Sequence, residues 1–241
     1  MLRIRNLAVA AATFAFAGSA QALPLVDVEV GARYWQANPD GFANYNGNDV
    51  DLQDDLGFDK EGTPNFYARA ALPLITLDAE YTNLDYSGNV GPQTIQWGGT
   101  DAEFTFDPDV PTSLEARLLH GGALFSLPLP FIDVGIGVGA TNIDADYTVA
   151  NETGSANVTL PVAKAELRAS LPMIPLNVGV RGNGIGFRGD QFTDITAEVG
   201  LEMGLLQLRA GYRQIALEYD GDDLTVDNDF SGPFAGLHLA F

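Results

Sequence analysis

The sequence contains no cysteine, which excludes disulfide bonds and thiolate metal sites. It has only two histidines, His120 and His238, so candidates for a catalytic base are few. Basic residues are also scarce, with 12 Lys and Arg against 32 Asp and Glu. This balance argues against nucleic-acid binding, because such affinity comes largely from Lys and Arg contacts to phosphates.

Long hydrophobic runs are absent beyond the first residues. The stretch MLRIRNLAVAAATFAFAGSAQA, residues 1–22, begins with Arg3 and Arg5 and closes on an A-x-A site. A charged start, a short apolar centre and this site predict a cleaved secretory signal peptide. The apolar run is shorter than the roughly 20 residues that a membrane helix needs. We therefore expect export, cleavage after Ala22 and a single mature domain over residues 23–241.

The mature chain also lacks a helical period. Apolar and polar residues alternate with period two instead, which predicts β-strands. The ten alternating segments lie near residues 26–35, 66–72, 75–81, 114–118, 132–138, 163–171, 176–181, 195–203, 208–212 and 235–241.

The connections between these segments alternate in length. Short apolar connections fall near residues 72–75, 127–131, 171–175 and 203–207, and long polar ones near 37–64, 84–112, 143–157, 186–193 and 220–229. Up-and-down membrane barrels have this asymmetry, with short periplasmic turns and longer outer loops. The sequence therefore predicts an all-β fold, a ten-stranded antiparallel up-and-down transmembrane β-barrel. The short turns are rich in Leu and Pro, which fits turns at the edge of a bilayer.

A soluble barrel or sandwich with an inward apolar face is the competing interpretation. The preference for Arg over Lys among the mid-strand basic residues favours the membrane barrel. Of the eight basic residues on the non-apolar face, seven are Arg, which pairs with enclosed carboxylates through a planar fork. Tyr34, Phe66, Tyr81 and Tyr212 stand near the loop-side strand ends, as an aromatic girdle does.

The charged face is therefore expected to line a narrow lumen and to fill it with ion pairs. The predicted lumen ion-pair network comprises Glu29, Arg33, Arg69, Asp78, Glu80, Glu115, Arg117, Lys164, Glu166, Arg168, Arg181, Glu198, Glu202, Arg209 and Arg213. Glycines 135, 137 and 139 on one inner face either leave a local void or fit beside bulky Arg side chains.

The last segment, FAGLHLAF, alternates and closes on an aromatic residue. Leu237, Leu239 and Phe241 resemble the terminal signal that barrel-assembly machinery reads in outer-membrane proteins. We therefore expect the machinery to be a partner and the cell outer membrane to be the location.

These features together resemble a known family. The signal peptide, the ten segments, DDLGF at 54–58, AGYR at 210–213 and the terminal Phe resemble small proteobacterial outer-membrane proteins named for a Gly-Gly feature. That resemblance implies a barrel of uncharacterised function, and Gly98-Gly99 and Gly121-Gly122 are both present. A more distant resemblance is to OmpW-like barrels, thought to pass small hydrophobic molecules. Those have eight strands, so that activity is not carried over.

The sequence offers few candidates for catalytic residues. Outer-membrane proteases and lipid hydrolases need a histidine base, and neither histidine is expected at the outer rim or beside a paired acid. We therefore expect no enzyme, no cofactor and no catalytic residue.

The acidic stretches at 49–61 and 220–229 do not fit the EF-hand spacing, so we expect no resident metal. A solvated rim is favoured there, although divalent cations are candidate partners that would bridge it to lipopolysaccharide. The leading hypothesis is a monomeric structural or surface-binding barrel. The alternative is a narrow or gated passage for small solutes.

Overall fold

The computed structural model describes residues 26–45, 48–90, 94–96, 103–105, 110–149, 152–187, 190–221 and 224–241. The expected signal peptide, residues 1–22, and the Gly98-Gly99 pair lie outside the described residues. No helix in the described part of the chain is long and apolar enough to cross a membrane.

Most of the described residues form β-strands. The strands are β1 (Asp27–Tyr45), β2 (Asn48–Asp51), β3 (Glu61–Ala71), β4 (Ile75–Val90), β5 (Thr94–Gln96), β6 (Glu103–Thr105), β7 (Val110–Leu129), β8 (Ile132–Val149), β9 (Glu152–Ser170), β10 (Leu176–Phe187), β11 (Asp190–Met203), β12 (Leu206–Asp220) and β13 (Leu224–Ala240).

Ten of these strands close into one antiparallel barrel. Their order is β1-β3-β4-β7-β8-β9-β10-β11-β12-β13, and β13 pairs back with β1. The short strand β2 pairs with the far end of β1, and β5 and β6 form a separate two-stranded sheet. The predicted ten-stranded antiparallel up-and-down barrel is confirmed, and each predicted segment matches one barrel strand, with at most one residue beyond its end.

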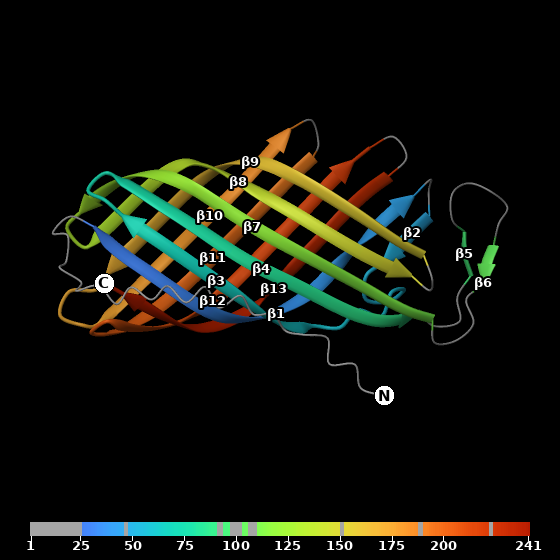
Figure 1. The fold of residues 1–241 in the computed structure, drawn as a ribbon, viewed down its shortest axis with the longest axis horizontal. Helices are drawn as coiled ribbons and strands as arrows, with labels where there is room; N and C mark the ends of the chain where they lie inside the picture. Colours follow the sequence, from blue (N-terminus) through green and yellow to red (C-terminus); the bar gives the residue numbers. More distant parts are fainter. Residues whose placement is uncertain are drawn as a thin grey trace.

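The barrel is long, and its strands are tilted to its axis (Figure 1). The four short turns gather at the end near the C-terminus, and the longer hairpins project at the other end (Figure 1). The prediction of long loops is partly wrong. Residues 143–149, 152–157, 186–187, 190–193 and 224–229 continue the strands, so much of the loop sequence forms an extension of the barrel wall.

The outward face of the wall changes from apolar to polar at one level along the barrel. On β8 the outward residues from Ile132 to Val138 are apolar, whereas Asn142, Asp144 and Asp146 further along are polar. Val138 is 70% exposed, as a lipid-facing side chain is in a bare barrel. The four residues of the predicted girdle also face outward and are exposed near this level: Tyr34 63%, Phe66 51%, Tyr81 37% and Tyr212 52%. We call the apolar outer band the belt and the wall beyond the aromatic residues the extension.

The inward face changes from charged to apolar at the same level. On β12 the buried Arg209 and Arg213 lie inside the belt, and Ile215 and Leu217 follow them inside the extension. The extension therefore has an apolar core. Its buried members are Trp35, Ala37, Leu52, Phe58, Leu84, Tyr86, Ala116, Leu118, Val162, Phe192, Ile215 and Phe234.

Two ladders of the wall end where the extension begins. The β3–β4 ladder ends at Asn65 opposite Thr82, and the β9–β10 ladder ends at Ala163 opposite Gly184. A proline, Pro64 or Pro161, lies one or two residues beyond and has no N–H to offer. The extension is therefore split into β4-β7-β8-β9 and β10-β11-β12-β13-β1, and the end of β3 and then β2 pair with the free side of β1.

The gap between β3 and β4 is covered by the loop that contains DDLGF. Leu52 and Phe58 of this loop are buried in the apolar core, and the Phe58 ring lies 6.0 Å from the Tyr86 ring. Thr112 donates a hydrogen bond from Oγ1 to the carbonyl oxygen of Leu56 at 2.7 Å. We call this gap the covered seam, and the gap between β9 and β10 the open seam.

Candidate functional site: the lumen and the extension

The lumen inside the belt brings together twelve of the fifteen predicted charged residues. They are Glu29, Arg33, Arg69, Asp78, Glu80, Lys164, Glu166, Arg168, Arg181, Glu198, Arg209 and Arg213, with side chains 1–15% exposed. Asp194, buried and ion-paired to Arg213, also lies there. Among the described residues the lumen thus holds seven cationic side chains and six carboxylates, so the charges nearly balance.

Glu80 on β4 is one centre of this network. Arg181 and Arg213 lie 2.7 Å and 2.8 Å from its carboxylate oxygens, and Arg33 lies 3.9 Å away. Asn65 donates a further hydrogen bond to it at 2.8 Å. Glu80 is 7% exposed, so one desolvated carboxylate faces three arginines, of which Arg213 also pairs with Asp194.

Glu29 on β1 is the second centre, nearer the short turns. Arg209 and Arg168 lie 2.8 Å and 3.3 Å from its Oε2. His238 donates from Nδ1 to Oε1 at 2.8 Å and accepts from Arg33 Nε at 3.3 Å. This arrangement fixes the tautomer of a fully buried histidine, which therefore has a structural role.

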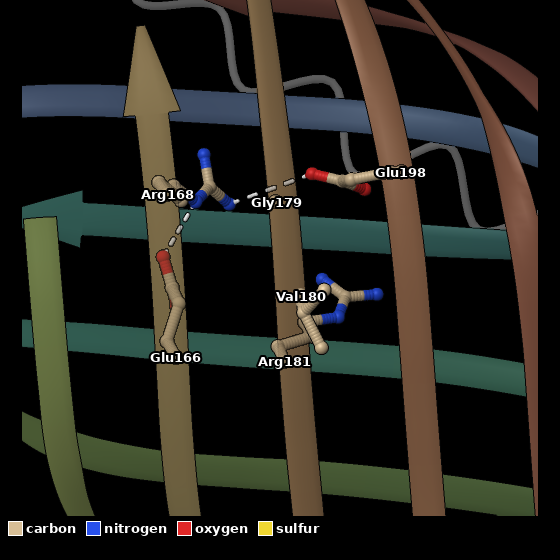
Figure 2. Close-up of a pocket in the computed structure, with 6 residues that line it drawn as sticks. All are labelled: Glu166, Arg168, Gly179, Val180, Arg181 and Glu198. Carbon is tan, nitrogen blue, oxygen red and sulfur yellow. Dashed lines mark ion pairs between the residues drawn. The ribbon is translucent and has the colours of Figure 1, made fainter. Parts of the chain in front are cut away.

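Arg168 on β9 contacts one carboxylate of its own strand and one of β11. It lies 2.5 Å from Glu166 and 3.9 Å from Glu198, and Figure 2 shows it between these carboxylates. Arg181 is beside them, and together they line a narrow gap with Gly179 and Val180.

Lys164 forms a separate cluster with Asp78 and His120. Its Nζ donates to Asp78 at 2.8 Å and contacts Nε2 of His120, whose Nδ1 lies 2.9 Å from Thr141 Oγ1. Glycines make room for the lysine stem. A Cβ on Gly122 would lie 2.5 Å from Lys164 Cδ, and one on Gly139 would lie 3.1 Å away.

The other two inner glycines face neighbouring strands. A Cβ on Gly135 would come within 3.1 Å of a Leu124 side-chain atom, and one on Gly137 would overlap the backbone of Ala123. The nearest neighbours of the three inner glycines are thus a lysine stem, a leucine and backbone atoms, and not the predicted arginines.

Two aromatic rings that were not predicted as lumen residues, Tyr67 and Trp35, pack against the arginines. The guanidinium carbons of Arg33 and Arg181 both lie 4.8 Å from the centre of the Tyr67 ring. Arg213 lies 5.0 Å from the Trp35 ring at the boundary with the extension. Such stacking favours Arg over Lys.

Glu115 and Arg117 were predicted in the lumen, and the structure places them on the outer surface instead. Their side chains are 40% and 39% exposed, whereas Ala116 and Leu118 between and beside them are buried in the extension core. The reason is the change of polarity between belt and extension. In the extension the polar face of a strand points outward, so the inward parity is the apolar one.

Glu202 is likewise not in the ion-pair network. It is exposed at the turn end of β11, where Asn177 donates a hydrogen bond to it at 2.8 Å. The C-terminal residues of the predicted assembly signal lie on the outer face of the belt. Leu237 is 54% exposed, Leu239 43% and Phe241 57%, and Phe241 pairs its backbone with Val28.

The acidic stretches do not form a metal centre in the described residues, where no group of three or more His, Asp or Glu side chains is placed to hold an ion. Asp51 instead stabilises the turn of the DDLGF loop. Its Oδ1 accepts hydrogen bonds from the backbone N–H groups of Gln53 and Asp54, both at 2.8 Å. On the outer wall, Arg117 bonds to Glu115 at 3.0 Å and to Asp144 at 3.3 Å.

Neither histidine lies at the outer rim. His120 is 5% exposed and His238 is fully buried, and both are held by lumen side chains. This placement matters for any comparison with barrel enzymes, because a general base must reach the substrate.

Comparison with known proteins supports the fold. No family model and no curated protein matches the chain, so the Gly-Gly family stays a prediction. The outer membrane protease OmpT from Escherichia coli is similar in structure, with a TM-score of 0.62 and 10% identity over 89% of this chain and 97% of that one.

Two weaker likenesses accompany it. The translocator domain of the autotransporter NalP from Neisseria meningitidis has a TM-score of 0.41 with 12% identity over 90% of this chain and 88% of that one. Neisserial surface protein A has a TM-score of 0.39 with 10% identity over 90% and 97%. At such identities the likeness to OmpT shows the fold alone: a closed antiparallel barrel of the kind found in that outer-membrane protein.

Proposed function

We propose that this chain is a monomeric, non-enzymatic protein of the bacterial outer membrane, whose sealed barrel holds a rigid binding extension outside the cell. The observation that carries the proposal is the reversal of polarity between belt and extension. An outward apolar face with a charged interior suits hydrocarbon, and an outward polar face with an apolar interior suits water. Both occur on the same strands.

Two successive layers of side chains close the interior of the barrel. Arginine–carboxylate pairs fill the lumen inside the belt, and the apolar core lies across the extension above it. This favours a structural or surface-binding role over the passage of small solutes. It also argues against catalysis, since both histidines are enclosed.

The expected partners follow from this placement. The belt would contact lipid and lipopolysaccharide, and Phe241 would be read by the assembly machinery. The exposed carboxylates beside Arg117 lie just beyond the belt, where divalent cations would bridge them to anionic lipopolysaccharide.

An arginine scan tests the membrane placement. Ile136, 64% exposed in the belt, and Asn142 in the extension both point outward from β8. Ile136→Arg is expected to cost about 2–4 kcal/mol in unfolding from lipid vesicles, and Asn142→Arg about 0–1 kcal/mol. Equal costs, or a mature chain that is soluble without detergent, would contradict the membrane placement.

Planar-bilayer recording tests the seal. The purified chain is expected to give no single-channel events across a range of voltages, with a known porin as the positive control. Reproducible conductance steps would contradict the sealed barrel and favour the passage.

A further inference from the structure

The open seam leaves a long strand edge without a partner. Residues of β9 from Glu152 to Val162 pair with β8 on one side, and no other described strand pairs with them. Inward and outward residues are both exposed in this part of the strand, including Asn157 on the outer side and Ala156 and Val158 on the inner side. An unpaired edge of this kind is a template for another strand.

The backbone groups that face the seam can be identified. At the base of β9, Ser170 N–H donates to Phe131 on the β8 side, and Leu171 N–H donates to Leu176 on the β10 side, both at 2.9 Å. The β8–β9 register runs unbroken up the strand, so this alternation is preserved. Even-numbered residues therefore bond to β8. The odd-numbered residues Thr153, Ser155, Asn157 and Thr159 present their N–H and C=O groups to the seam.

The usual protections of an edge are nearly absent. Residues 153–160 read TGSANVTL, with no charged side chain and no bulge in the register. Pro161, also odd-numbered, blocks the edge only at its base, where it ends the β9–β10 ladder. The free edge above it is long enough for a typical strand of five or six residues.

We propose that the open seam binds an extended segment of a partner polypeptide, which adds to β9 as a further strand. This inference rests on the proposed function, because the seam must face water rather than lipid. Backbone hydrogen bonds to the odd-numbered residues supply affinity, as in other cases of strand addition.

The side chains beside the edge set the sequence of the partner. On the inner side its alternate residues meet Ala156, Val158 and the edge of the apolar core at Leu160, so they are apolar. On the outer side the others lie beside polar residues of β9. Asp144 and Asp146 stand one strand further on, where Arg117 already pairs with both, so the outer positions of the partner are expected to be polar.

Other occupants fit less well. The β5–β6 hairpin contacts β2, which pairs with β1 and so lies at the other edge of the part of the extension that begins with β10. A second copy in the same membrane would present its β9 edge about a twofold axis along the membrane normal. The two edges would then run in the same sense with opposite tilts of roughly 35–45°, and such crossed strands cannot form a ladder.

The experiment uses the full chain refolded in lipid nanodiscs. Nine-residue peptides that alternate apolar and polar positions are displayed on phage and selected on the barrel, with empty nanodiscs as counter-selection. The selected peptides are expected to slow hydrogen exchange at Ser155, Asn157 and Thr159, which exchange fast in the free protein, and to leave Ala156 and Val158 unchanged.

Matched variants test the backbone role. Ser155→Pro with Asn157→Pro removes two seam-facing N–H groups and leaves the β8 ladder intact, so peptide affinity is expected to fall tenfold or more. Ser155→Ala with Asn157→Ala keeps these groups and is expected to bind normally. No peptide enriched over empty nanodiscs, or equal binding by the proline variant, would overturn the inference. Protection of the odd-numbered amides in the free protein would overturn it too. None of these results affects the arginine scan or the conductance test, so the two proposals fail separately.

Discussion

Replacement of Glu80 by alanine is the sharpest test of the ion-paired lumen. Arg181 and Arg213 lie within 2.8 Å of this carboxylate, and Arg33 is 3.9 Å away. Without it the described lumen would hold seven cations against five carboxylates. Removing one partner of a buried pair costs about 3–5 kcal/mol, because the remaining charge stays desolvated. With a urea m value of about 2 kcal/mol per molar, the unfolding midpoint would fall by about 1.5–2.5 M.

Urea unfolding in vesicles, followed by tryptophan fluorescence, measures the effect. Glu115→Ala is the matched control, since that carboxylate is 40% exposed and Arg117 keeps Asp144 and Asp146 as partners. A surface pair of this kind contributes at most about 1 kcal/mol. Glu80→Gln, which keeps the volume, separates loss of charge from loss of packing. If Glu80→Ala unfolds within about 0.5 M of Glu115→Ala, the lumen carboxylates do not hold the arginines together.

Three further changes probe other parts of the molecule, and chelation probes the surface. Gly122→Ala would bring a Cβ to 2.5 Å from Lys164 and is expected to lower the melting temperature, whereas Gly121→Ala meets only a backbone oxygen at 3.8 Å and is expected to be neutral. Phe58→Ala is expected to cost about 3–5 kcal/mol of local stability and to open the covered seam to proteases. Burial raises the pKa of Asp85 beyond the belt, and two neighbouring glutamates add to this. Its folded pKa therefore exceeds the unfolded value, and ionisation as pH rises costs stability, so Asp85→Asn is expected to stabilise the protein at pH 7 and not near pH 3. EDTA is expected to speed proteolysis of the acidic loops in lipopolysaccharide membranes; an unchanged rate would remove divalent cations from the partners.

The strands and turns could be predicted because the belt imposes a simple rule. Within the belt, every second residue must suit hydrocarbon and the others must fit a crowded charged interior. Ile132 to Val138 with their alternating glycines obey this rule, and so do Ala163 to Leu167. Most of the predicted lumen residues lie in such stretches, which is why their grouping was accessible from the sequence.

The extension could not be read by the same rule. Leu114, Ala116 and Leu118 are as apolar as a lipid-facing row, yet they face the interior, and Glu115 and Arg117 face water. A signal was nevertheless present. Leu118 is followed directly by Leu119, which is 56% exposed in the belt, and an apolar doublet of this kind marks a change of phase. The Tyr34-Trp35 doublet marks the same change on β1.

The position of the seams gives independent support for the same boundary. In hydrocarbon an unpaired strand edge would leave backbone N–H and C=O groups without partners, at a cost of several kcal/mol each. All ten ladders are therefore expected to be continuous wherever lipid surrounds the wall. The two broken ladders end at Asn65–Thr82 and Ala163–Gly184, next to the aromatic ring at Phe66 and at the top of the apolar row on β8. Side-chain polarity and backbone pairing thus place the edge of the hydrocarbon at one level. Only beyond that level, where water can satisfy a free edge, can the wall open toward a partner.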